Sequence, residues 1–94
     1  MKVVYKITYP NGKIYIGQDV TDSFMTYFGS GNKDYIQSDF TWEQMQNFSI
    51  KKEILWAKED ATPAELTEKE NELIIKHGSN NPLKGYNLIP KYKE

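Results

Sequence analysis

The turn Pro10-Asn11-Gly12 lies between two runs of strand-forming residues and limits how the first part of the chain can fold. Residues 3–9, VVYKITY, and residues 13–17, KIYIG, are rich in β-branched and aromatic side chains. Two such runs, separated by a short segment with proline, asparagine and glycine, predict a β-hairpin.

Two registers of this hairpin are compatible with the turn. A two-residue Asn-Gly turn would pair Pro10 with Lys13 and place Tyr5 and Tyr15 on opposite faces of the sheet. A three-residue loop would instead use Pro10 at the second position of a type I turn, with Gly12 in the left-handed conformation. We prefer the three-residue loop, because a proline is poorly placed inside a strand ladder.

The preferred register has a consequence for the tyrosines. It places Tyr5 and Tyr15 on one face, and the missing side chain of Gly17 leaves space beside Tyr5. The predicted pairs are Tyr9 with Lys13, Ile7 with Tyr15, and Tyr5 with Gly17.

Further elements follow from capping signals and periodicity. We expect a short helix over residues 33–39 and a second one that starts at Trp42, after Thr41 and Gln44 in capping-box spacing. Residues 48–56, FSIKKEILW, alternate as a third strand does. The side chains predicted to share one phase of this strand are Phe48, Ile50, Ile54 and Trp56, and both Trp42 and Trp56 are expected in the core.

The clearest helix begins after Thr62. This residue, Pro63 and Glu65 combine an N-cap, a proline at the first helical position and a capping box. The helix should run to about His77 and stop at Gly78. Its apolar stripe contains a carboxylate, Glu70, which indicates a salt bridge, a boundary position or a metal ligand. The other members of the stripe are Leu66, Leu73, Ile74 and His77.

The order of elements predicts an α+β fold, a small three-stranded antiparallel sheet flanked by helices, in a single domain over residues 1–94. The chain has no cysteine, no apolar run long enough for a membrane span and no hydrophobic signal-peptide region, so we expect a cytoplasmic protein that does not enter membranes. A turn at Gly85 should let residues 84–92 return as a short edge element.

Charge is distributed unevenly along the chain. The net charge is −1, which argues against a general nucleic-acid binder. Residues 1–20 carry +2 and residues 76–94 carry +3, whereas residues 34–75 carry −6. The two ends would form one positive face if they met in space.

Tyr5 and Tyr15, with Ile16-Gly17 after the second tyrosine, resemble the GIY-YIG nuclease superfamily, with VVY in place of the first motif. The resemblance continues over most of the chain, through YFGSGN at 27–32, NFSIKKEIL at 47–55, EKENELIIKHG at 68–78 and GYNL at 85–88. It implies a central three-stranded sheet and hydrolysis of DNA phosphodiester bonds with one divalent metal ion, usually Mg²⁺, with Mn²⁺ as a substitute.

The resemblance also implies roles for individual residues. Glu70 would hold the metal ion, Tyr5 or Tyr15 would orient or deprotonate the attacking water, and Asn87 would tie the C-terminal element to the site. Gly17 would have a structural role there. A phenol needs a nearby cation to act as a base near neutral pH.

The chain departs from the family pattern because it has no arginine. Lys33 is the best substitute at the catalytic site and Lys13, on the tyrosine face, is the other candidate. Together with Lys84 they are the candidate DNA-contacting residues. A lysine supplies charge without the bidentate fork of a guanidinium group.

Three interpretations remain open. The chain is a metal-dependent DNA endonuclease, a related fold that has lost catalysis and binds nucleic acid or protein, or an unrelated α+β domain whose tyrosines only pack. The small size leaves modest specificity, a homodimer or guidance by a partner as options for target choice. The nuclease interpretation requires that the two phenols and Glu70 converge on one cleft.

Overall fold

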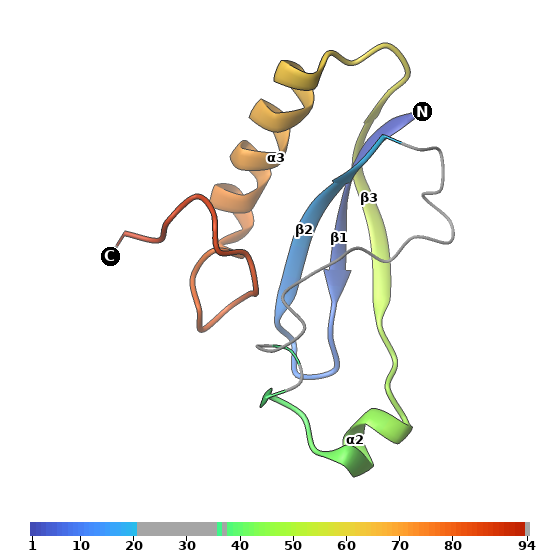
Figure 1. The fold of residues 1–94 in the computed structure, drawn as a ribbon, viewed down its shortest axis with the longest axis vertical. Coiled ribbons are helices and arrows are strands. Elements are labelled where there is room, and N and C mark those ends of the chain that lie inside the picture. The colour runs from blue at the N-terminus through green and yellow to red at the C-terminus, as the bar shows by residue number, and fades with distance from the viewer. Residues whose placement is uncertain (21–35, 37, 94) are drawn as a thin grey trace.

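The computed structural model describes residues 1–20, 36 and 38–93. Strands β1 (Lys2–Thr8), β2 (Ile14–Asp19) and β3 (Lys51–Lys58) form an antiparallel sheet in the order β2-β1-β3. With helices α2 (Trp42–Gln46) and α3 (Pro63–His77) they make the predicted α+β fold (Figure 1). The predicted helix over residues 33–39 lies mostly outside the described residues.

The hairpin has the three-residue loop that the sequence favoured. The backbone N–H of Tyr9 donates to the carbonyl of Lys13 at 2.9 Å, and Gly12 N–H donates to the carbonyl of Tyr9 at 2.9 Å. Gly12 has a φ of 86°, a conformation that glycine adopts without steric strain. The three predicted pairs are confirmed, since Tyr5 faces Gly17 and Ile7 faces Tyr15 in the ladder, and Tyr9 is hydrogen-bonded to Lys13.

Helix α3 has the predicted limits. Thr62 Oγ1 accepts from the backbone N–H of Glu65 at 3.1 Å, and the Glu65 carboxylate accepts from the N–H of Thr62 at 3.2 Å. The helix ends at Gly78, whose φ of 71° closes it with a left-handed cap. These caps satisfy backbone groups that the helix itself cannot pair.

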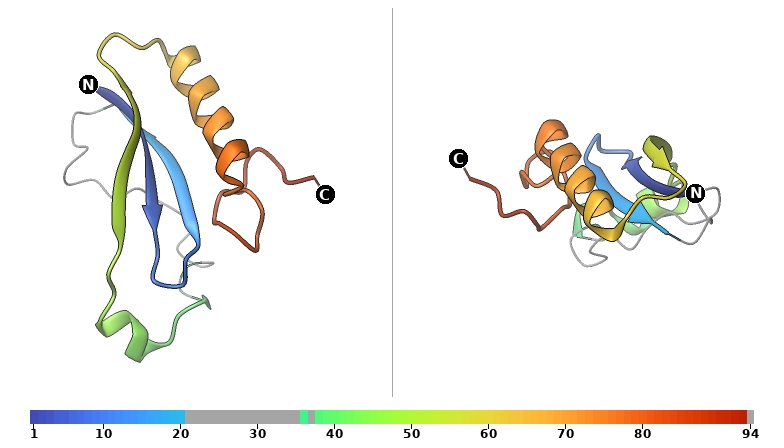
Figure 2. Two further views of the ribbon diagram at one scale, coloured as in Figure 1. Left: turned by 180° about the vertical axis from the view of Figure 1, so that it is seen from behind. Right: turned by 90° about the horizontal axis from the view of Figure 1, so that it is seen from above.

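Alternate residues of β1 send their side chains to two separate apolar clusters. One face carries Tyr5 and Ile7, and Tyr15, Phe48 and Ile50 pack around them. The other face carries Val4 and Ile16, which pack against Leu66 and Ile74 of α3. Helix α3 therefore covers the face opposite the tyrosines, on the β2 side of the sheet (Figure 2).

The prediction for the third strand was wrong in its limits and in its phase. The strand begins at Lys51, and its pairing with β1 shifts register between Val4 and Tyr5. Ile54 pairs with Tyr5, but Trp56 pairs with Val4 and so packs on the α3 face. A bulge of this kind changes the face on which later side chains lie, and simple alternation does not reveal it.

The prediction that Trp42 lies in the core was also wrong. Its side chain is 72% exposed at the start of α2, a five-residue helix with no buried residue. Among the residues that the structure describes, no helix combines the length and the apolar content that crossing a membrane requires.

The edge element predicted over residues 84–92 is present only at its start, where the C-terminal segment pairs with the outer edge of β2, and residues 86–93 form no strand. Ile14 N–H donates to the carbonyl of Lys84 at 3.0 Å, and Tyr86 N–H donates to the carbonyl of Ile14 at 2.9 Å. Ile14 and Gly85 form an isolated parallel bridge. This pairing brings the basic first hairpin and the basic C-terminal segment into contact.

Candidate functional site

Tyr5 and Tyr15 form a pair on the sheet face that α3 does not cover. Their ring centroids are 6.4 Å apart, with an angle of 50° between the ring planes. A Cβ atom on Gly17 would lie 2.6 Å from Cζ of Tyr5 and 3.1 Å from Cε2 of Tyr15. The phenol of Tyr5 therefore extends from β1 across Gly17 on β2, as the sequence predicted.

A lysine that the sequence analysis did not select lies over this pair. The Nζ atom of Lys52 is 4.7 Å from the ring centroid of Tyr5, a cation–π distance. Burial lowers the pKa of Lys52, and the nearby Asp19 opposes that change. The sequence does single out Lys52, because it stands between Ile50 and Ile54 in the alternating pattern of the predicted strand, at a position where an apolar residue is expected.

Asn87 completes the edge of β2 with its side chain. Its Oδ1 accepts from the backbone N–H of Ile16 at 2.8 Å, and its Nδ2 donates to the carbonyl of Ile16 at 2.8 Å. The carboxamide thus replaces the backbone of a neighbouring strand at this position. It ties the C-terminal segment to β2.

Glu70 lies half-buried on α3, at the other face of the sheet. Burial raises the pKa of its carboxyl group, and a hydrogen bond with the Gln18 side chain opposes that rise. The described residues contain no group of three or more histidine, cysteine, aspartate or glutamate side chains that could hold a metal ion. A single carboxylate fits magnesium, which keeps several waters and takes oxygen atoms from its substrate.

These contacts meet on three consecutive residues of β2. Ile16 is held by Asn87 and Gly17 underlies Tyr5. The side chain of Gln18, the next residue, opposes the rise in the pKa of Glu70. The tyrosines reach this stretch from one face of the sheet, and Glu70 on α3 lies at the other face, so the structure does not bring the two phenols and the carboxylate into the single cleft that the nuclease interpretation requires.

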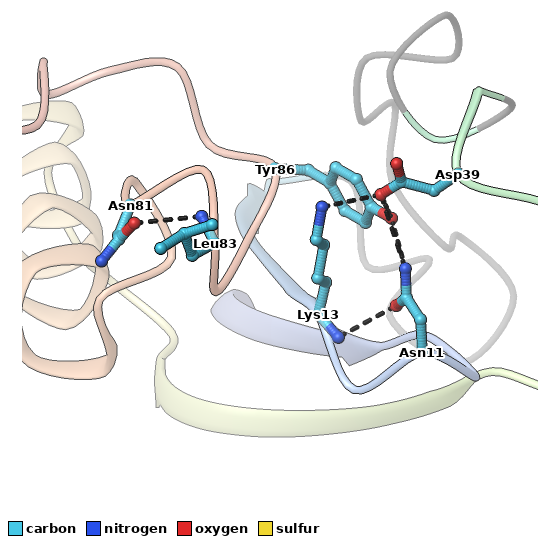
Figure 3. Close-up of polar contacts among 6 residues, drawn as sticks. All are labelled: Asn11, Lys13, Asp39, Asn81, Leu83 and Tyr86. Carbon is cyan, nitrogen blue, oxygen red and sulfur yellow. Dashed lines mark hydrogen bonds and ion pairs between the residues drawn. The ribbon is translucent and has the colours of Figure 1, made fainter.

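A second polar cluster lies where the hairpin turn meets the C-terminal segment (Figure 3). Oδ2 of Asp39 accepts from Lys13 Nζ at 2.8 Å and from the Tyr86 hydroxyl at 2.7 Å. Asn11 Nδ2 donates to the Tyr86 oxygen at 3.0 Å. Lys13 and then Tyr86 lower the pKa of Asp39, whereas burial and then Asp39 raise the pKa of Tyr86 to about 12.

A pocket of about 470 Å³ opens beside this cluster. Two predicted site residues, Lys13 and Asn87, line it, but Tyr5, Tyr15 and Glu70 do not, so this pocket is not the cleft predicted from the sequence. The other residues of its wall are Ser38, Asp39, Asn80, Pro82, Gly85, Tyr86, Leu88, Lys91 and Tyr92.

The predicted basic residues have different positions. Lys13 is held in its ion pair with Asp39. Lys84 is exposed at the end of α3, where its Cδ would lie 3.2 Å from a Cβ on Gly78. Lys33 lies outside the described residues.

No protein-family model, curated protein or solved structure matched the chain. The functional assignment therefore depends on the motifs of the sequence and on the geometry of the described residues.

Proposed function

We propose that the chain is a metal-dependent DNA endonuclease. The observation that supports this proposal is that Asn87 and Tyr5 contact Ile16 and Gly17 of the YIG motif, with Glu70 half-buried beside Gln18 at the other face of β2. These contacts link residues from both ends of the chain to the YIG motif.

In this proposal Glu70 supplies a carboxylate oxygen to one divalent cation. Magnesium, or manganese in its place, would neutralise negative charge on the phosphate and on the leaving 3′ oxygen when bound there. Tyr5 or Tyr15 orients the attacking water or takes its proton. Asn87 acts by positioning, because it fixes the backbone of β2 beside the phenols.

In this proposal Lys52 supplies the positive charge that an arginine provides in the family pattern, since this chain has no arginine. Its ammonium group lies against the ring of Tyr5, in an environment that excludes part of the solvent. A cation at this position favours the charged form of a neighbouring acid group. The role first assigned to Lys33 or Lys13 thus has a third candidate on β3.

The second candidate function is a binding module that has lost catalysis. The 1% exposure of Tyr5 favours it, because so deeply buried a phenol suits a packing role. Such a module would bind nucleic acid or a protein without cleaving it. A homodimer would enlarge the binding surface in either case, and a chain without cysteine suits the reducing cytoplasm.

Cleavage assays distinguish the two functions. Plasmid and single-stranded DNA are incubated with the protein in Mg²⁺, Mn²⁺ or chelator, beside Glu70→Gln and the matched control Glu68→Gln on an exposed position of α3. The nuclease predicts metal-dependent cleavage that is lost in Glu70→Gln and kept in Glu68→Gln. Intact DNA in every condition, with all proteins folded by circular dichroism, selects the binding module.

A further inference from the structure

The pocket beside Tyr86 has the size and the walls of a site for a planar ligand. Its volume of about 470 Å³ lies in the range of small-molecule sites. Tyr92 and Leu88 contribute side chains that are 39% and 59% exposed, so apolar surface remains uncovered there. Aromatic and apolar surfaces of this kind accept the face of a nucleobase by stacking.

The polar groups of the pocket favour a base that donates hydrogen bonds. Lys13, Asn11 and Tyr86 all donate to Oδ2 of Asp39, whereas Oδ1 accepts no hydrogen bond from any residue that the structure describes (Figure 3). A carboxylate oxygen is an acceptor for the exocyclic amino group of cytosine, adenine or guanine. Lys91, also in the pocket wall, supplies a positive charge for a phosphate.

Asn87 connects this pocket to the proposed catalytic residues. It belongs to the pocket wall and also holds the backbone of Ile16, next to the glycine that underlies Tyr5. A nucleotide whose base lies in the pocket would therefore place its backbone close to the edge of β2.

We infer that the pocket binds an unpaired nucleobase with an exocyclic amino group, in a DNA strand whose neighbouring phosphate lies at the β2 edge. The inference depends on the proposed nuclease function for the identity of that strand. A base inside a duplex cannot enter such a pocket without leaving the stack. The preferred substrate is therefore single-stranded or locally unpaired DNA.

The test measures binding apart from cleavage. Metal-free ¹⁵N-labelled Glu70→Gln protein is titrated with deoxycytidine, deoxyadenosine, deoxyguanosine or thymidine monophosphate, and with deoxyribose 5-phosphate as a control without a base. Binding to a DNA strand is measured with two oligothymidines, one of which carries a single central cytosine. Lys91→Ala removes a pocket residue, and Lys93→Ala, two residues along, is the matched control outside the pocket wall.

The inference expects amide shifts at Gly85, Tyr86 and Asp39, with the amino-bearing nucleotides about fivefold tighter than thymidine monophosphate, the effect of one added hydrogen bond. Lys91→Ala should weaken binding severalfold and Lys93→Ala should not. The strand with cytosine should bind more tightly than the free nucleotide and than oligothymidine.

Three results would overturn the inference. These are the same shifts with deoxyribose 5-phosphate, no shifts at the pocket with any nucleotide, or a free nucleotide that binds while the strand does not. Base binding without cleavage by the wild-type protein would instead remove the nuclease function and keep the base pocket. Cleavage without base binding would keep the nuclease function and remove the base pocket.

Discussion

The phenol of Tyr5 occupies the space that a side chain at Gly17 would fill. A Cβ atom on Gly17 would lie 2.6 Å from Cζ of Tyr5, well inside the distance that two carbon atoms tolerate. Tyr5 is fully buried in a sheet whose centre is its own strand, so the ring cannot move away easily. The glycine of the YIG motif and the first tyrosine are therefore one structural unit.

This relationship predicts that Gly17→Ala is destabilising. The free energy of unfolding should fall by about 1–3 kcal/mol, the usual cost of forcing an extra carbon into a packed site. Gly12→Asn is the control, because Gly12 has open space around it and asparagine tolerates a positive φ. Urea denaturation measures both variants, and equal stability of the two would contradict the account.

Asn87→Ala should also lower stability. The variant leaves the N–H and carbonyl of Ile16 without their 2.8 Å partners, at a cost of about 1–3 kcal/mol in free energy of unfolding. Hydrogen exchange at the Ile16 amide should become faster. Asn71→Ala on α3 is the control for loss of an asparagine, and an unchanged exchange rate at Ile16 would refute the assigned contact.

The stability of the protein should decrease on mild acidification because of His77. Burial lowers the pKa of this histidine below its ordinary 6.5, and the positive charges of Lys6 and Lys76 lower it further. The negative charge of Glu53 opposes this change. The unfolded chain then binds the proton more readily, so stability falls as pH drops below about 6.5 and levels off below the folded pKa. His77→Gln should flatten the profile of melting temperature between about pH 8 and about pH 5.5; a profile identical to wild type would exclude His77 as the cause.

The Asp39–Tyr86 hydrogen bond predicts a titration shift. Burial and then Asp39 raise the pKa of Tyr86 to about 12. Asp39→Asn removes the negative charge but keeps the burial, so the pKa should decrease toward 10.0 without reaching it. NMR of ¹³C-tyrosine, with the signal assigned by Tyr86→Phe, measures this pKa, and an unaltered midpoint in Asp39→Asn would rule out the predicted contribution.

The parts of the fold with strong local signals were predictable from the sequence. Proline and glycine in the turn at 10–12 determine the hairpin register, and the capping box at Thr62 with Gly78 determines both ends of α3. The same register places Tyr5, Tyr15 and Gly17 together. Local chemistry decides each of these features, so a single sequence is sufficient.

Features that depend on tertiary contacts were not predictable. The register shift opposite Val4 and Tyr5 turns Trp56 to the other face, although its position in the alternating pattern suggested otherwise. Asp39 joins Lys13 and Tyr86 only because the chain folds back on the hairpin, since it is 26 and 47 residues away from them. The position of Lys52 among alternating apolar residues was visible in the sequence. Its contact with Tyr5 was not, because Tyr5 lies on β1 and Lys52 on β3, with β2 between them in the sequence.

The central claim is that Glu70 holds a metal ion at the edge of β2, beside the stretch that Tyr5 and Asn87 also contact. Paramagnetic broadening by Mn²⁺ in ¹⁵N NMR spectra tests it most directly, because the effect falls steeply with distance from the ion. The account predicts that substoichiometric Mn²⁺ broadens the amides of Gly17, Gln18 and Glu70 first, and that Glu70→Gln abolishes this broadening while Glu68→Gln preserves it. Broadening centred on Asp39, or broadening at β2 that persists in Glu70→Gln, would contradict the account.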